Sequence, residues 1–129
     1  METTAVVRVC MIQLTLIGPP PLINRSYKSG NGRFYKDGEQ KVRQEAYQWQ
    51  ARAQYRGKPL EGSLSVVYEF YYQKANTDWE SGVKGMQDAL NGIVFVDDVQ
   101  ISEATVRKYH DAKNPRVVVT VRQINAVET

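Results

Sequence analysis

The chain has 129 residues, a mass of 14.7 kDa and a formal net charge of +3, enough for one hydrophobic core and too short for two full domains. Its 42% hydrophobic and 24% charged residues are typical of a globular protein and exclude disordered and collagen-like classes. Cys10 and His110 are the single cysteine and histidine, so an intramolecular disulfide and a zinc site with three or four Cys or His ligands are excluded.

The N-terminal segment predicts a strand that ends near residue 16. Its apolar residues alternate with Gln13 and Thr15, the period of a half-buried strand, and Arg8 is the exception: Val6, Cys10, Ile12, Leu14 and Leu16. The apolar run over 5–17 is too short to span a bilayer, and Met1-Glu2 lacks the positive charge of a signal peptide. We therefore expect a cytoplasmic protein without a membrane partner.

A loop and then a helix are predicted next. Gly18-Pro19-Pro20-Pro21 ends the strand, and no apolar period is present over 18–37, which predicts a long loop. Asp37 and Gln40 resemble a capping box, which predicts a helix from about Gly38 to Arg56. Its apolar residues recur with helical spacing: Val42, Ala46, Trp49 and Ala53.

The C-terminal half predicts one more helix and three more strands. Residues 64–72 alternate as a strand, and a second helical stripe ends at Asn91-Gly92: Trp79, Val83, Met86 and Leu90. The β-branched segments Val99 to Tyr109 and Arg116 to Ile124 are predicted to form an antiparallel hairpin. The order β-α-β-α-β-β predicts an α/β (α+β) fold, a single domain over residues 1–129 with a mixed sheet and both helices on one side.

The charges of the chain are polarised. Residues 1–60 contain ten Lys/Arg and four Asp/Glu, whereas residues 61–129 contain seven and ten, giving net charges of +6 and −3. The basic residues between Arg25 and Lys58 are interleaved with aromatic ones, a mixture that suits phosphate binding with base stacking. The alternative is a solvated helix face with tyrosines that extend from the core.

Two acidic stretches, Asp78-Trp79-Glu80 and Asp97-Asp98, are the candidate catalytic groups. If the backbone is extended through Asp78 and Glu80, both carboxylates point to one face, whereas in a helix they diverge. With Ser81 as the N-cap, Lys84 lies one turn into the helix beside the same site. Trp79 is expected either to anchor this helix in the core or to contact DNA.

A cluster of carboxylates without His or Cys is typical of a Mg²⁺ site, with Mn²⁺ as a substitute. A hard cation beside a basic surface is the combination that hydrolyses phosphodiesters. The alternatives are a structural capping box at 77–80 and a surface turn at Asp97-Asp98. The sequence gives no indication of a nucleotide cofactor.

Four motifs resemble the RusA family of Holliday junction resolvases. They are 20–27 (PPLINRSY), Asp78-Trp79-Glu80-Ser81 with Lys84, 88–92 (DALNG) and 97–101 (DDVQI), and their order and spacing match most closely from Lys84 to Ile101. Glu80 and Ser81 stand where the family pattern usually has Asp followed by Asn, and Lys74 stands alone where it usually has more basic residues.

The resemblance implies a homodimeric, Mg²⁺-dependent endonuclease that nicks four-way DNA junctions symmetrically, often encoded by phages or prophages. Its essential carboxylates correspond to Asp78, Glu80 and Asp98, and its catalytic lysine corresponds to Lys84. Asp97 is expected either to support the metal ligands or to lie in an exposed turn, and Asp88 to pair with Lys84 at i, i+4. The residues expected to contact branched DNA are Asn24, Arg25, Tyr27, Lys28, Arg33, Lys36 and Lys74.

Two competing hypotheses keep the same fold. In the first, Glu80 and Ser81 mark an inactive site, and the protein only binds branched DNA. In the second, the protein is a nuclease for flap or single-stranded substrates, without a preference for four-way junctions.

Overall fold

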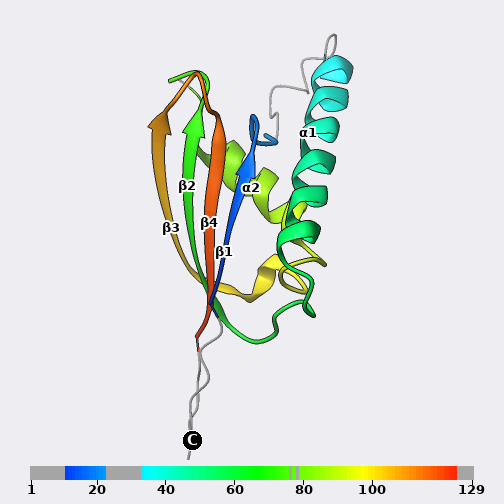
Figure 1. The fold of residues 1–129 in the computed structure, drawn as a ribbon, viewed down its shortest axis with the longest axis vertical. Helices are drawn as coiled ribbons and strands as arrows, with labels where there is room; N and C mark the ends of the chain where they lie inside the picture. Colours follow the sequence, from blue (N-terminus) through cyan, green and yellow to red (C-terminus); the bar gives the residue numbers. More distant parts are fainter. Residues whose placement is uncertain (1–10, 23–32, 76, 78, 125–129) are drawn as a thin grey trace, which may run out of the picture.

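The computed structural model describes residues 11–22, 33–75, 77 and 79–124, with side chains from residue 38 onward in the first helix. A four-stranded mixed sheet carries two helices on the same face (Figure 1). The elements in chain order are β1 (Met11–Ile17), α1 (Arg33–Gln54), β2 (Leu64–Tyr72), α2 (Trp79–Leu90), the 3-10 turn η3 (Asp98–Gln100), β3 (Ile101–His110) and β4 (Arg116–Gln123). The predicted α+β class and the order β-α-β-α-β-β are confirmed.

The predicted pairing of the last two strands is wrong. The strand order is β1-β4-β2-β3, so β2 lies between β3 and β4 (Figure 1). β3 runs parallel to β2, whereas β4 is antiparallel to both β1 and β2. The predicted strands exist, but they do not form a hairpin.

The connection through α2 explains this topology. A helix that links two neighbouring strands returns the chain to the same end of the sheet, so β3 must run parallel to β2. Residues 111–115 then cross the end of β2, about 10 Å for two strand spacings. The crossing is held by the Asp111 N–H, which donates to the Tyr72 carbonyl at 2.9 Å, and by Arg116, which donates to the Asp111 carboxylate at 3.0 Å.

Helix α1 begins at Arg33, five residues before the predicted start, and Asp37 and Gly38 lie inside it. Glutamines on one of its faces bind the free edge of β1. The Gln50 side-chain amide accepts from the Ile17 N–H at 2.7 Å and donates to the Ile17 carbonyl at 2.8 Å. Gln54 forms the same pair of bonds with Thr15 at 3.0 and 2.8 Å. These amides satisfy the exposed backbone of an edge strand and block its pairing with another strand.

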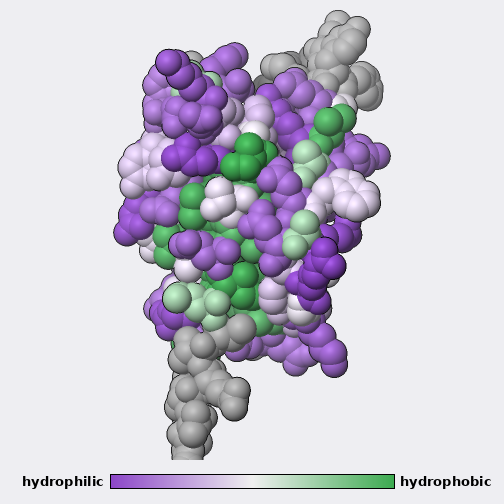
Figure 2. All heavy atoms as spheres, viewed as in Figure 1, coloured by the Kyte–Doolittle hydropathy of each residue, from purple (hydrophilic) through white to green (hydrophobic). Residues whose placement is uncertain are grey.

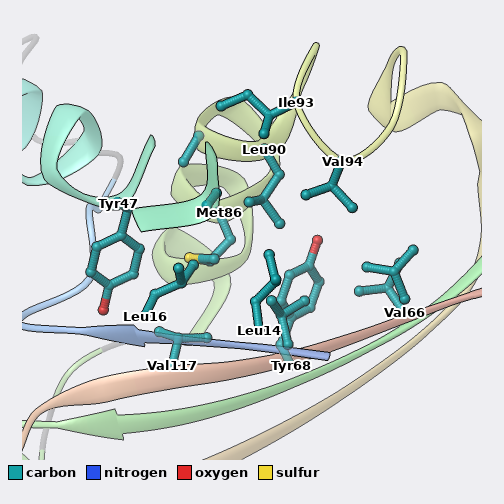
Figure 3. Close-up of a cluster of buried hydrophobic side chains, with 14 of the residues drawn as sticks. Leu14, Leu16, Tyr47, Val66, Tyr68, Met86, Leu90, Ile93, Val94 and Val117 are labelled. Atoms are coloured by element: carbon teal, nitrogen blue, oxygen red, sulfur yellow. The ribbon is translucent and has the colours of Figure 1, made fainter. Parts of the chain in front are cut away.

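The hydrophobic core lies between the helices and the sheet. Figure 3 shows Leu14, Leu16 and Tyr68 on the sheet beneath Met86 and Leu90 of α2. Helix α1 adds Tyr47, whose hydroxyl donates to the Gly18 carbonyl at 2.6 Å. The apolar stripe that predicted this helix is on its other side, and all four of its members are exposed: Val42, Ala46, Trp49 and Ala53.

Helix α2 ends where the sequence predicts. Leu90 is its last residue, and Gly92 follows with a φ of +81°, a left-handed conformation that favours glycine. Val94 and Phe95 then return into the core, and the Leu60 N–H donates to the Val94 carbonyl at 2.8 Å. No helix in the described part of the chain has the length and apolarity to cross a membrane.

Candidate active site

Helix α2 presents Lys84 to two carboxylates. The Lys84 Nζ lies 3.5 Å from Asp88 Oδ1, which is the predicted i, i+4 pair, and 3.8 Å from Asp98 Oδ2. About half of the Lys84 side chain is exposed, so its ammonium group is open to solvent and to an incoming anion. Lys84, Asp88 and Asp98 thus form one charged cluster at the side of α2.

The turn η3 fixes Asp98 beside this helix. Gln100 carries most of the anchoring, because its amide nitrogen donates to the Leu60 and Gly62 carbonyls, each at 2.9 Å. Its amide oxygen accepts from the Asp97 N–H at 2.8 Å. Gln100 belongs to the 97–101 motif, but no role was predicted for it from the sequence. A glutamine three residues after an aspartate was the available signal of this capping geometry.

Asp97 and Asp98 share a hydrogen bond between their side chains. This bond raises the pKa of Asp98, and partial burial with the negative charges of Asp97 and Asp88 raises it further. Lys84 opposes these effects by stabilising the ionised form. The two adjacent carboxyls therefore repel each other when both are ionised, and a bound cation would relieve that repulsion.

The hydroxyl of Tyr68 points from the sheet toward the helix layer (Figure 3). Tyr68 is fully buried, and its hydroxyl has no hydrogen-bond partner within the described residues. Burial raises the pKa of Tyr68, and the Asp98 charge adds to the effect, so the phenol remains protonated. From the sequence, Tyr68 was predicted to lie in a strand, and no signal indicated the influence of Asp98 on its hydroxyl.

Two side chains at the end of β3 hold the segment that leads to α2. Lys108 Nζ donates to the Thr77 carbonyl at 2.8 Å, and His110 Nε2 donates to the Gln73 carbonyl at 3.0 Å. The Thr77 hydroxyl also donates to the Lys74 carbonyl at 2.9 Å. These bonds hold the Gln73, Lys74 and Thr77 carbonyls, which lie between β2 and α2 in the sequence.

The positions of Glu80, Ser81 and Trp79 differ from those expected from the sequence. Glu80 is exposed in the first turn of α2, so the extended arrangement that would align it with Asp78 is absent there. Ser81 is the third residue of the helix and does not cap it, and Trp79 is 51% exposed, so it does not anchor the core. Within the described residues, no three His, Cys, Asp or Glu side chains meet in a metal-binding group.

Most of the residues predicted to contact DNA lie outside the part of the chain that the structure describes. Outside the described residues lie Asp78, Asn24, Arg25, Tyr27 and Lys28, and the side chains of Arg33 and Lys36 are also outside them. Lys74 is exposed and lines a cavity of about 240 Å³ with Arg43, whose guanidinium donates to the Glu39 carboxylate at 2.7 Å. Arg43 was one of many basic residues in the sequence, and its proximity to Lys74 depends on the tertiary fold.

Comparison with known proteins decides the family. The family model described as Endodeoxyribonuclease RusA matches residues 17–122, most of the chain. The chain belongs to the RusA endodeoxyribonuclease family. It is also 39% identical over 49 residues to the uncharacterized protein YqaN of Bacillus subtilis (strain 168), a match that covers 38% of this chain and 34% of YqaN. The family that the motifs of the chain resemble is therefore confirmed.

The donor types of this candidate site suit a hard cation. The side chains beside Lys84 supply only oxygen donors, which Mg²⁺ prefers over imidazole or thiolate. The neighbouring Asp97 carboxyl raises the pKa of Asp98, and the repulsion between the two ionised carboxylates is the condition that a hard cation relieves.

Lys108 provides a test of the positioning contacts in this RusA-family protein. Lys108→Met removes the donor to Thr77 and keeps most of the side-chain stem, so we expect kcat for DNA cleavage to fall about tenfold, the loss typical of groups that orient metal ligands. KM should change less than twofold, and Lys108→Arg should restore most of kcat. Lys113→Met, at an exposed position in the 111–115 connection, is the matched control. A rise in KM with unchanged kcat would instead identify Lys108 as a DNA contact.

Proposed function

We propose that this RusA-family protein is a Mg²⁺-dependent endonuclease that cleaves four-way DNA junctions in recombination and repair. The observation that carries the proposal is the cluster of Lys84, Asp88 and Asp98, in which one exposed cation lies within 4 Å of two carboxylates. A phosphodiester nuclease needs a positive group at the scissile phosphate and carboxylates for a metal ion, and this cluster supplies both types. A phage or prophage origin is part of the same proposal.

The metal ligands in this proposal are Asp78, Glu80 and Asp98. Glu80 is the second residue of α2 and Asp98 lies in η3 beside that helix, while Asp78 directly precedes the helix in the sequence. A bound Mg²⁺ ion, or Mn²⁺ in its place, would polarise the scissile phosphate and lower the pKa of the attacking water. Asp97 supports Asp98 through their shared hydrogen bond.

Lys84 acts on the phosphate. Its ammonium group lies 3.5 Å from the Asp88 carboxylate and 3.8 Å from the Asp98 carboxylate. These distances are long for an ion pair and leave the N–H donors of the ammonium available. When DNA binds, the ammonium donates to a nonbridging phosphate oxygen and offsets the negative charge that develops as the P–O bond breaks. Asp88 keeps the lysine oriented by pairing with it across one helical turn.

The basic residues of the N-terminal half bind the backbone phosphates of the junction in this proposal. They are Arg25, Lys28, Arg33 and Lys36, joined by the polar Asn24 and Tyr27 and by Lys74, which lies between β2 and α2 in the sequence. Phosphate contacts recognise the shape of branched DNA more than its base sequence. A homodimer with twofold symmetry would place one site on each of two opposing strands of a four-way junction.

The proposal is tested with a panel of substrates of equal length: a four-way junction, a 5′ flap, a single strand and a linear duplex. With Mg²⁺ we expect cleavage of the four-way junction at a rate at least tenfold above that of the other substrates. Comparable rates on flap or single-stranded DNA would support a broader nuclease. Retention of the junction in a gel shift without cleavage in Mg²⁺ or Mn²⁺ would show a protein that only binds branched DNA.

A further inference from the structure

The outer face of α1 carries an apolar stripe that is unusual for an exposed helix. Val42 is 65% exposed and Trp49 is 72% exposed, and Ala46 and Ala53 are exposed between and after them. Figure 2 shows apolar and weakly polar side chains at intervals along α1 among strongly hydrophilic ones. The polar face of the same helix is used internally, because Gln50 and Gln54 bind the edge of β1. The helix therefore turns its glutamines to the protein and its apolar stripe to solvent.

The spacing of the stripe is that of a helix-pairing seam. Its members are separated by four, three and four residues, the a/d pattern of a heptad repeat. In heptad notation Val42 and Trp49 are d positions, and Ala46 and Ala53 are a positions. From residue 42 to residue 53 the seam is about 16 Å long, at 1.5 Å for each residue. Such a seam is stable in water when a second helix covers it.

The seam is complementary to itself in the antiparallel direction. When two copies of α1 are aligned so that residue numbers across the seam sum to 95, Val42 lies opposite the partner's Ala53, and Trp49 lies opposite the partner's Ala46. Each large side chain thus meets a small one, the arrangement that lets layers interdigitate.

Charges beside the seam select the same alignment. Glu45 and Arg52 are exposed g positions, about two helical turns apart on either side of the stripe's centre. In an antiparallel pair the g positions of the two helices face each other, so Glu45 of one copy lies beside the partner's Arg52, and symmetry repeats the contact. A parallel pair would not bring these two residues together.

We infer that the outer face of α1, defined by Val42, Ala46, Trp49 and Ala53, pairs antiparallel with the same face of a second copy of this chain. The inference deepens the homodimer of the proposed function by naming its interface. It depends on the size and charge complementarity of α1 and uses no residue of the candidate active site, so the two proposals are tested by different measurements.

The test exchanges the charges that flank the seam. Glu45→Arg and Arg52→Glu are each expected to place like charges at both contacts and to raise the dimer dissociation constant about tenfold or more, measured by sedimentation velocity without DNA or metal. An equimolar mixture of the two variants should recover a dimer, because every facing pair is then Arg with Glu. Lys41→Glu, an exposed charge on another face of α1, should leave association unchanged.

The outcomes separate the interface from the nuclease activity. Circular dichroism that matches the wild-type spectrum confirms that each variant is folded. A monomeric wild-type protein, single variants that dimerise as the wild type does, or a mixture that stays monomeric would each overturn the inferred interface. Loss of junction cleavage in a variant that still dimerises would concern the proposed function and leave the interface standing.

Discussion

Asp98→Asn is expected to reduce cleavage of a four-way junction about 10³-fold while junction binding is retained. Asp98 is a proposed metal ligand, and its carboxylate lies 3.8 Å from the exposed Lys84 ammonium. The amide keeps the shape of the side chain but has no charge to hold a divalent cation. Metal stabilisation of a phosphoryl group contributes several kcal/mol to the transition state, and each 1.36 kcal/mol corresponds to a tenfold change in rate.

The same substitution is expected to stabilise the metal-free protein at neutral pH. The Asp97 hydrogen bond, partial burial and neighbouring carboxylates raise the pKa of Asp98 above its ordinary value, so the fold disfavours the ionised carboxylate. The contribution of Asp98 to the stability of the wild type is therefore fully present below the ordinary pKa of aspartate and is lost as the pH rises through the raised pKa. The asparagine variant lacks this decrease, so its advantage in thermal stability should appear above that pH.

Thermal unfolding with and without Mg²⁺ checks this prediction together with the cleavage rate. Mg²⁺ should raise the Tm of the wild type by binding the native state, and the shift should be absent in Asp98→Asn. Glu103→Gln, at an exposed position on β3, is the control and should keep both activity and the Mg²⁺ shift. Full activity in Asp98→Asn would remove Asp98 from the proposed ligand set.

Gly85→Ala is expected to have the largest effect on stability. A Cβ at Gly85 would overlap the carbonyl oxygen of Pro21 and lie 2.7 Å from its carbonyl carbon. The neighbouring atoms belong to backbone, so they cannot move aside as a flexible side chain would. Overpacking of this kind costs about 3 kcal/mol, which outweighs the gain of about 1 kcal/mol in helix propensity from glycine to alanine.

The close approach at Gly85 also concerns the site, because Lys84 is its neighbour on α2. A helix displaced from the segment at Pro21 would carry Lys84 away from Asp98, so kcat should fall together with the free energy of unfolding. Urea denaturation measures the loss in stability, which we expect to be about 2 kcal/mol. Gly38→Ala in α1 is the matched control, since a Cβ there meets nothing within 4 Å, and a gain of about 0.5–1 kcal/mol is expected. Equal stability of Gly85→Ala and the wild type would show that α2 does not pack this closely.

Local signals in the sequence predicted the elements of the fold well. Alternation identified the strands, and Asn91-Gly92 marked the end of α2 because a left-handed residue is needed there. The pairing of β3 and β4 was predicted wrongly because proximity in sequence favours a hairpin, whereas the crossover through α2 sets β3 beside β2. Sheet order depends on contacts between distant segments, which periodicity does not encode.

Helix α1 shows a second limit of sequence patterns. Its apolar period correctly predicted a helix, but a stripe on a helix is expected to face the core, and this one is exposed. On the inner side of α1 the buried residues are Tyr47 and Ala51, and the amides of Gln50 and Gln54 match the free N–H and C=O groups of an edge strand. The spacing of Gln50 and Gln54 was visible, but the edge that they bind could be known only from the sheet order.

The candidate site was predicted where its residues are close in sequence. The Lys84–Asp88 pair follows from helical spacing, and the structure adds the contact of Lys84 with Asp98 across the turn η3. The contributions of Lys108 and His110 were not predicted, because they come from β3 and reach a segment more than 30 residues earlier. Such contacts require the parallel pairing of β2 and β3.

Mapping the nicks in a four-way junction tests the central claim most directly. Each strand of a fixed junction is labelled in turn and incubated with the wild-type protein in Mg²⁺, and the products are treated with DNA ligase. The account predicts nicks at symmetric positions in two opposing strands, ligatable ends, and no product in EDTA. Cleavage that persists in EDTA, or nicks confined to one strand, would contradict a paired carboxylate-and-metal nuclease centred on Lys84 and Asp98.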